Sequence, residues 1–215
     1  MNNRLYWNIR TRALNGHSES AWILGEAFLD GFGWNSCGER FQVRRNRKTA
    51  VRWLHYASVL KNPDAMVSLA MQIAITNQVE DIRKALAWEK CAYRLGNRFV
   101  AYNIALSYAM LECPKDCFRW LRKGRLSETR LALAYCYAFG YGTRKNVQKA
   151  KSLLQPLARD VIGDQPERKC AQNFLHILNT THVCHLRPPQ NSSPAFPLGK
   201  RGRNEATHLF HQRCQ

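Results

Sequence analysis

Three carboxylates near the start of the chain are the first residues whose spacing could serve chemistry. Glu19, Glu26 and Asp30 lie at positions i, i+7 and i+11, so in a helix they share one face. Paired carboxylates can act as a general acid and base, but the sequence places no histidine or nucleophile with them in a catalytic motif. We therefore expect these carboxylates to recognise a basic peptide or to pair with a neighbouring arginine.

Histidines and cysteines near the C-terminus could in principle bind zinc. They fall into two groups, His182, Cys184 and His185, then His208, His211 and Cys214. Together they would supply enough imidazole and thiolate for a tetrahedral site. The segment between the groups contains four prolines, and neither group has the spacing of a zinc finger. We expect no bound metal.

The remaining cysteines do not suggest catalysis either. Cys113 and Cys117 have a C-x3-C spacing, which does not fit the C-x2-C redox motif. The eight cysteines do not recur in pairs, so we expect most of them to be reduced, with Cys91 and Cys136 as small core residues. The sequence contains no phosphate-binding loop, nucleophile elbow, zinc-protease motif or dinucleotide fingerprint. We therefore expect neither an enzyme nor a cofactor.

An internal repeat indicates which elements must position these residues. Ala50, Trp53 and Ala57 have the same spacing as Ala85, Trp88 and Ala92, and each set lies on one face of a helix. Each such helix follows another apolar helix, and these first helices begin near residues 20, 65, 100 and 129. The interval between units is near 36 residues but irregular. A two-helix unit cannot bury its apolar face alone, so the units must stack.

The repeat resembles the Sel-one-like repeat, a relative of the tetratricopeptide repeat. The matching residues are Leu24-Gly25, Phe28, Gly31, Gly33, Lys48, Ala50, Trp53 and Ala57; Lys84-Ala85, Trp88, Ala92 and Gly96; and Tyr137, Gly140, Gly142 and Lys149-Ala150. The resemblance covers residues 4 to about 179. It implies an all-α fold, a right-handed α-solenoid of about four helix-turn-helix units plus capping helices. It also implies a scaffold or adaptor role in protein interactions, with no shared catalytic residues.

The composition divides the chain into two parts. Residues 1–179 are expected to form the solenoid, with residues 4–16 and 167–179 as its capping helices. Residues 180–215 are rich in proline, histidine and basic residues, and we expect this tail to be disordered. The sequence shows no signal-peptide-like start and no stretch of membrane-spanning length, so we expect a cytoplasmic location.

The resemblance also indicates a binding groove, because in tetratricopeptide-like solenoids the first helix of each unit lines the concave surface. The residues placed there are Glu19, Trp22, Glu26, Leu29, Asp30, Asp64, Val67, Met71, Tyr102, Leu106, Met110, Glu128, Leu131, Tyr135 and Phe139. Residues 100–111 and 131–142 are apolar nearly all round, which has two explanations. Tight curvature could bury them inside the protein, or a partner segment or the protein's own tail could occupy the groove. We expect a partner peptide or helix to bind there.

The charge balance suggests an alternative. The chain has 33 Lys plus Arg against 15 Asp plus Glu, a net charge of +18. The basic residues near the turns and second helices include Arg44, Arg45, Arg47, Lys48, Arg52, Arg119, Arg122, Lys123 and Arg125. They could be a solvated surface, or they could bind nucleic acid or an acidic partner, as an immunity-type inhibitor binds a toxin. No nucleic-acid-binding motif supports the second interpretation.

Overall fold

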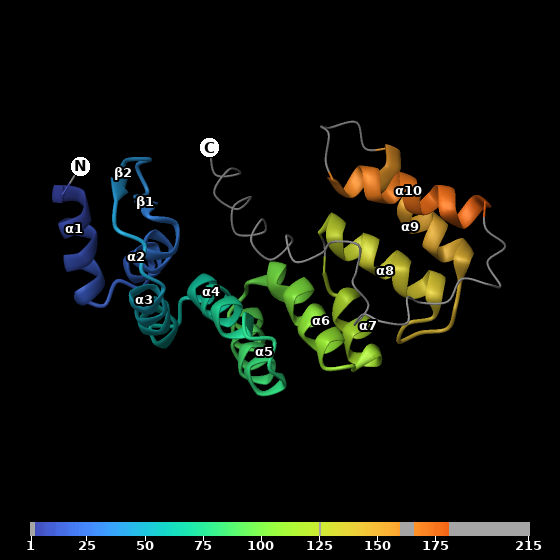
Figure 1. Ribbon diagram of the computed structural model, residues 1–215, viewed down its shortest axis with the longest axis horizontal. Coiled ribbons are helices and arrows are strands. Elements are labelled where there is room, and N and C mark those ends of the chain that lie inside the picture. Colours follow the sequence, from blue (N-terminus) through green and yellow to red (C-terminus); the bar gives the residue numbers. More distant parts are fainter. Residues whose placement is uncertain (1–2, 125, 160–165, 181–215) are drawn as a thin grey trace. The chain divides into compact units, whose positions relative to one another are not determined.

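Paired helices make up most of the chain. The computed structural model describes residues 3–124, 126–159 and 166–180. Its described residues form ten α-helices, one short 3₁₀ helix and two short strands (Figure 1). They divide into a first unit up to Asn97 and a second unit from Arg98, and each unit is described by itself. The predicted tail lies outside the described residues, apart from Thr180.

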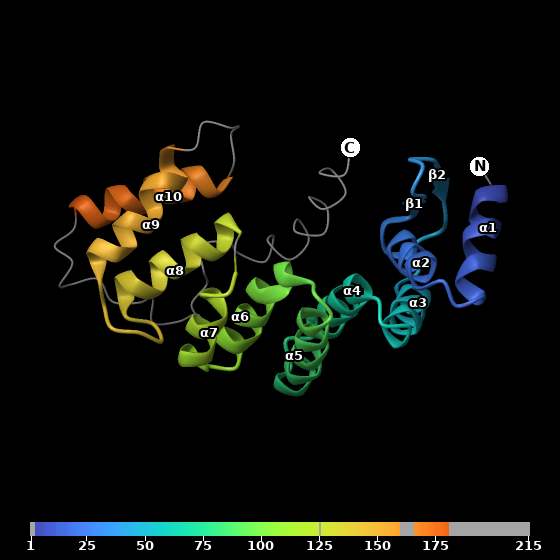
Figure 2. The same ribbon diagram turned by 180° about the vertical axis from the view of Figure 1, so that it is seen from behind.

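The first unit contains five helices and both strands. In chain order these are α1 (Asn3–Leu14), α2 (Ser18–Asp30), β1 (Phe32–Trp34), β2 (Arg40–Gln42), α3 (Arg47–Val59), α4 (Pro63–Ala74) and α5 (Val79–Arg94). Helix α2 packs on α3 and α4 packs on α5, which are the two helix pairs predicted from the repeat. Helix α3 also contacts α4, and α1 covers α2 as the predicted leading cap (Figure 2).

Local signals set the ends of these helices. The side chain of Asn46 accepts a hydrogen bond from the backbone N–H of Thr49 at 3.0 Å, and Asn62 accepts one from Ala65 at 2.8 Å. Such N-caps satisfy amides that a helix start leaves without a partner. Pro63 follows Asn62 at the first helical position, where a proline needs no amide partner. The caps fix where α3 and α4 begin.

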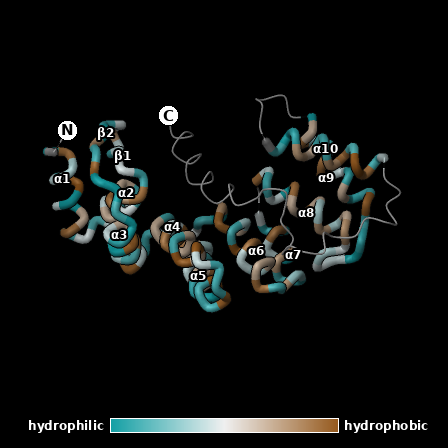
Figure 3. The backbone as a smooth tube through the Cα atoms, viewed as in Figure 1, coloured by the Kyte–Doolittle hydropathy of each residue, from teal (hydrophilic) through white to brown (hydrophobic). Residues whose placement is uncertain are grey.

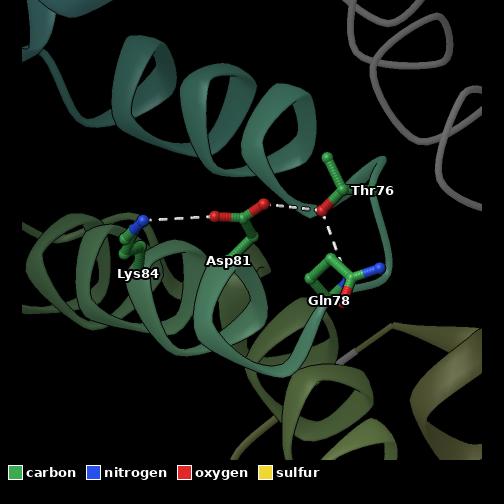
Figure 4. A network of polar contacts seen from close by, with 4 residues as sticks. All are labelled: Thr76, Gln78, Asp81 and Lys84. Carbon is green, nitrogen blue, oxygen red and sulfur yellow. Dashed lines mark hydrogen bonds and ion pairs between the residues drawn. The ribbon is translucent and has the colours of Figure 1, made fainter.

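The turn between α4 and α5 is held by a small polar network (Figure 4). The Thr76 hydroxyl donates to Asp81 Oδ2 at 2.7 Å and accepts from the Gln78 amide at 3.3 Å. Asp81 Oδ1 also accepts from Lys84 Nζ at 3.2 Å. Asn77 takes a left-handed conformation with φ 56°, which asparagine tolerates better than most residues. The network therefore makes a tight turn without a glycine.

The connection after α2 contains structure that the sequence analysis did not predict. Strands β1 and β2 form an antiparallel ribbon in which Gly33 pairs with Phe41. The side chain of Phe41 is buried in the first unit, while the Arg40 guanidinium lies 4.4 Å from the centre of the Phe32 ring. One inward aromatic residue thus anchors a ribbon that is too short to give a clear alternating pattern.

The repeat tryptophans have matching surroundings. Trp88 on α5 packs against Ala70, Ala74 and Ala85, and the ring of His55 on α3 meets it edge to face with centres 6.1 Å apart. Trp53 on α3 packs in the same way against the core beneath α2. Trp88 therefore joins two successive helix pairs, as the repeat pattern indicated.

The second unit continues the pairing. Its elements are η1 (Arg98–Val100), α6 (Ala101–Met110), α7 (Pro114–Leu121), α8 (Ser127–Phe139), α9 (Val147–Arg159) and α10 (Pro166–Thr180). Helix α6 packs on the short α7, α8 packs on α9, and α10 covers both α9 and α8 as the predicted closing cap. Apolar and polar residues alternate along the helices of each unit (Figure 3). The predicted all-helical fold of paired helices is confirmed.

Candidate interaction site

Helices α2 and α4 gather four carboxylates on the first unit. Glu19, Glu26 and Asp30 come from α2, and Asp64 comes from the first turn of α4. Asp30 and Asp64 both act on Glu26 electrostatically, and Glu19 acts on Asp64. We call these four residues, together with Trp22, the acidic face. The structure therefore groups the carboxylates that the sequence analysis assigned to the groove in this unit.

Glu26 is the most unusual member of the acidic face. Its side chain is only partly exposed, and its Oε1 atom is fully enclosed without a hydrogen-bond partner in the structure. Burial raises the pKa of Glu26 to about 7, with further increases from Asp30 and Asp64. Hydrogen bonds from Ser68 and Trp22 act in the opposite direction but do not offset burial. Glu26 therefore titrates near neutral pH.

Neighbouring side chains fix this carboxylate in place. The Trp22 indole Nε1 lies 3.4 Å from Ser68 Oγ on α4, so the two helices are joined beside Glu26. Asp64 accepts a hydrogen bond from Asn97 Nδ2 at 2.8 Å, and burial followed by repulsion from Glu19 raises its pKa. The sequence analysis missed Ser68 and Asn97, because neither belongs to the repeat pattern.

No described cation neutralises the acidic face. Ion pairs join Arg83 to Glu80, Lys84 to Asp81 and Arg119 to Asp116, and none of these pairs includes Glu19, Glu26, Asp30 or Asp64. Arg45 comes close, but its Nε donates to the backbone oxygen of Asp30 at 2.9 Å. The expected alternative, pairing of these carboxylates with a neighbouring arginine, is therefore absent from the part of the chain that the structure describes. In a chain of net charge +18, such a group of unpaired carboxylates is unusual.

The apolar groove residues of the first unit remain accessible. Trp22, Val67 and Met71 are all half-buried, so part of each side chain faces solvent. Because Val67 and Met71 follow Asp64 along α4 at helical spacing, they extend the acidic face with an apolar strip. A carboxylate cluster beside aromatic and thioether surface suits a peptide with both basic and apolar side chains.

Half of the predicted apolar groove residues of the second unit are internal. Leu131 is fully buried, and Tyr102 and Tyr135 are only 6% and 7% exposed, so none of the three offers contact area to a partner. The ring of Phe174 on α10 stacks on Phe139 at an interplanar angle of 7° and lies 6.1 Å from Tyr135. Of the two explanations for these apolar helices, burial inside the protein holds for these three residues. Leu106, Met110 and Phe139 remain half-buried.

Several basic residues are committed to structural contacts. Arg47 donates to the side chain and the backbone oxygen of Gln72 at 3.0 and 2.7 Å, and Arg119 pairs with Asp116. Lys123 Nζ lies 3.9 Å from the centre of the Trp120 ring. Arg44, Lys48, Arg52 and Arg122 are exposed, and Arg125 lies outside the described residues. The accessible basic surface is therefore smaller than the sequence indicated.

The thiols resemble packing residues. Cys136 and Cys117 are fully buried, and burial raises the pKa of Cys117 to about 12, which keeps its thiol protonated. Cys113 is half-buried and its Sγ contacts the Leu111 backbone oxygen at 3.3 Å. Cys136 is confirmed as a core residue, whereas Cys91 is only partly buried.

The described residues offer neither a metal-binding cluster nor a membrane-spanning helix. Across the described ranges, no group of three or more His, Cys, Asp or Glu side chains is arranged to hold a metal ion. The histidines and cysteines of residues 182–214 lie outside those ranges. None of the helices that the structure describes combines the length and apolar character needed to cross a membrane.

These features define a mostly helical repeat protein built from stacked helix pairs. A family profile for the Sel1 repeat matches residues 18–58, 63–97 and 126–160, more than half of the chain. The chain belongs to the Sel1 repeat family. The matched segments coincide with the pairs α2–α3, α4–α5 and α8–α9, so the predicted resemblance is confirmed.

Two solved structures share the fold. A Sel1 repeat protein from Oxalobacter formigenes is similar with a TM-score of 0.66 and 17% identity, covering 89% of this chain and 74% of that one. Protein c5321, described as a protective antigen of uropathogenic Escherichia coli, is similar with a TM-score of 0.64 and 18% identity over 80% of this chain. This chain spans only 35% of the length of that antigen. The sequence matches no curated protein.

Proposed function

We propose that this protein is a non-enzymatic interaction module that binds a basic segment of a partner protein at the acidic face of its first unit. The observation that carries the proposal is the group of four carboxylates that no described cation neutralises. Membership of a repeat family supports the proposal, because repeat proteins commonly mediate protein interactions. The half-buried Trp22, Val67 and Met71 would supply apolar contacts beside the charges.

Selection from a random peptide display library tests this proposal. We expect peptides enriched in Lys and Arg next to an apolar residue. The double variant Glu19→Gln/Asp30→Asn removes two exposed charges of the acidic face and should weaken the selected peptides about 5- to 10-fold, since each rim charge contributes modestly.

A matched variant controls for net charge. Glu80→Gln/Glu112→Gln removes two exposed carboxylates outside the acidic face, so it should leave peptide affinity unchanged. Selected peptides without basic residues, or equal losses in the two double variants, would rule out the acidic face as the binding surface.

A second candidate function rests on the exposed basic residues. Arg44, Lys48 and Arg52 lie on or just before α3, and none of them takes part in an ion pair within the described ranges. We propose as the alternative that they bind nucleic acid or an acidic protein through charge, with strong salt dependence. The two candidate functions use different residues, so substitutions in the acidic face and in the basic residues test them independently.

A further inference from the structure

We propose that Glu26, with Trp22 and Asp64 beside it, forms a subsite for one cationic side chain, lysine or arginine, of the bound segment. This inference rests on the proposed function and assigns one residue of the acidic face a specific role. It concerns the one enclosed carboxylate, whereas the proposal above rests on the acidic face as a whole.

The hydrogen bonding of Glu26 carries the inference. Buried carboxylate oxygens in folded proteins are nearly always paired or hydrogen-bonded, because an unsatisfied one loses its hydration without compensation. Ser68 and Trp22 act on the Glu26 carboxylate, yet Oε1 has no hydrogen-bond partner. A glutamine or an apolar residue would be the more stable choice for a purely structural position. The unsatisfied oxygen indicates a group that receives its partner from outside.

The charges around Glu26 specify that partner. The groups that act on Glu26 electrostatically are Asp30 one turn along α2 and Asp64 on α4, and both are negative. A cation placed there would interact favourably with all three carboxylates. An anion would be repelled by the same charges, so the subsite favours cations over anions.

Trp22 adds a second contact for a cation. It lies four residues before Glu26 on α2, so the two side chains share one face of the helix. An aromatic ring beside carboxylates is a favourable setting for an ammonium or guanidinium group. The side chain of Glu26 is partly exposed, and we place the cation at this exposed part, beside Trp22.

The titration of Glu26 makes the subsite measurable. A cation stabilises the ionised carboxylate, so its binding must lower the pKa of Glu26 and must be stronger where Glu26 is already ionised. With a pKa of about 7, the ionised fraction rises about tenfold from pH 6 to pH 8. Affinity for a cationic probe should rise by about the same factor.

NMR titration of the full chain tests the inference with three blocked tripeptides, Gly-Lys-Gly, Gly-Arg-Gly and Gly-norleucine-Gly. The readouts are the indole N–H signal of Trp22 and the carboxyl carbon of Glu26, assigned by comparison with Glu26→Gln. We expect the lysine or the arginine tripeptide to bind at least tenfold more tightly than the norleucine one and to lower the pKa of Glu26. The better of the two cations identifies the side chain.

Variants decide between specific and diffuse attraction. Glu26→Gln should abolish the shift of the Trp22 signal, whereas Glu80→Gln, which removes the same charge from α5, should preserve it. The inference is overturned if norleucine binds equally well, if Glu26→Gln still binds the cation, or if no tripeptide gives a saturable shift at 50 mM, roughly the limit for a useful subsite. If the tripeptides still bind but the affinity of the selected peptides does not depend on the acidic face, the proposed function is overturned while the Glu26 subsite stands.

Discussion

At the scale of single residues, Glu26 should make stability depend on pH. Its folded pKa is raised from 4.5 to about 7, so the folded protein binds this proton more tightly than the unfolded chain does. The stabilisation is complete below about pH 4.5 and is lost as pH rises through 7. The contribution of this proton to the free energy of unfolding is on the order of 2 kcal/mol, after allowance for the partial exposure of the side chain.

The comparison of wild type with Glu26→Gln isolates this effect from other titrations. Between pH 4.5 and pH 8, the stability of wild type relative to Glu26→Gln should fall by about 2 kcal/mol, measured by urea unfolding at each pH. A difference that stays constant with pH would show that Glu26 does not titrate in this range.

At the scale of elements, Gly142 sets how closely the α8–α9 connection approaches α7. A Cβ atom at this position would overlap the backbone oxygen of Pro114, and φ is +70°. Gly142→Ala should therefore destabilise the protein by at least about 2 kcal/mol in urea unfolding.

Gly96 provides the matched control for Gly142. It also has a positive φ, of 106°, but no atom lies within 4 Å of an added Cβ. Gly96→Ala should cost only about 1 kcal/mol, from backbone strain alone. Equal losses for the two glycines would mean that the close approach to Pro114 is not maintained in solution.

Trp88 tests the contact between successive helix pairs. Because it packs between α4 and α5 and meets His55 from α3, Trp88→Ala should cost about 3 kcal/mol by leaving a cavity. Trp7 is 54% exposed on α1, so Trp7→Ala should change the free energy of unfolding by about 0.5 kcal/mol or less. Similar midpoints for both variants in urea unfolding would contradict the assignment of Trp88 to the repeat interface.

At the scale of the whole molecule, the charge of +18 predicts some attraction to polyanions. The triple variant Arg44→Glu/Lys48→Glu/Arg52→Glu should reduce the slope of log affinity against log salt for random duplex DNA by about 3 if these residues contact three phosphates. Fluorescence anisotropy at 50 and 200 mM salt, concentrations of roughly the range in which such contacts weaken, measures that slope.

Arg47 and Arg119 are left out of the triple variant because both make structural contacts. Both are exposed but engaged by Gln72 and Asp116, so reversing their charge would mix a structural effect with the charge effect.

If wild type fails to bind DNA even at the lower salt concentration, the nucleic-acid version of the second candidate function is excluded.

The sequence by itself determined the helical pairing. Alanine, tryptophan and glycine at a fixed spacing indicate helices that are stable only against neighbours, because each buries one narrow face. The pattern therefore located α3, α5 and the closing helix α10, and it placed Glu19, Glu26 and Asp30 on one face of α2. The ribbon of β1 and β2 lies outside the pattern because its strands are three residues long.

Only the tertiary structure decided which groove residues are accessible. Helical spacing places Tyr102, Leu131 and Tyr135 on a face but cannot say that packing within the second unit buries them. The same limit applies to Glu26, whose pKa is raised by burial and by charges that include Asp64 from a different helix. Burial and electrostatics depend on what surrounds a side chain in three dimensions, whereas periodicity records only neighbours along one helix.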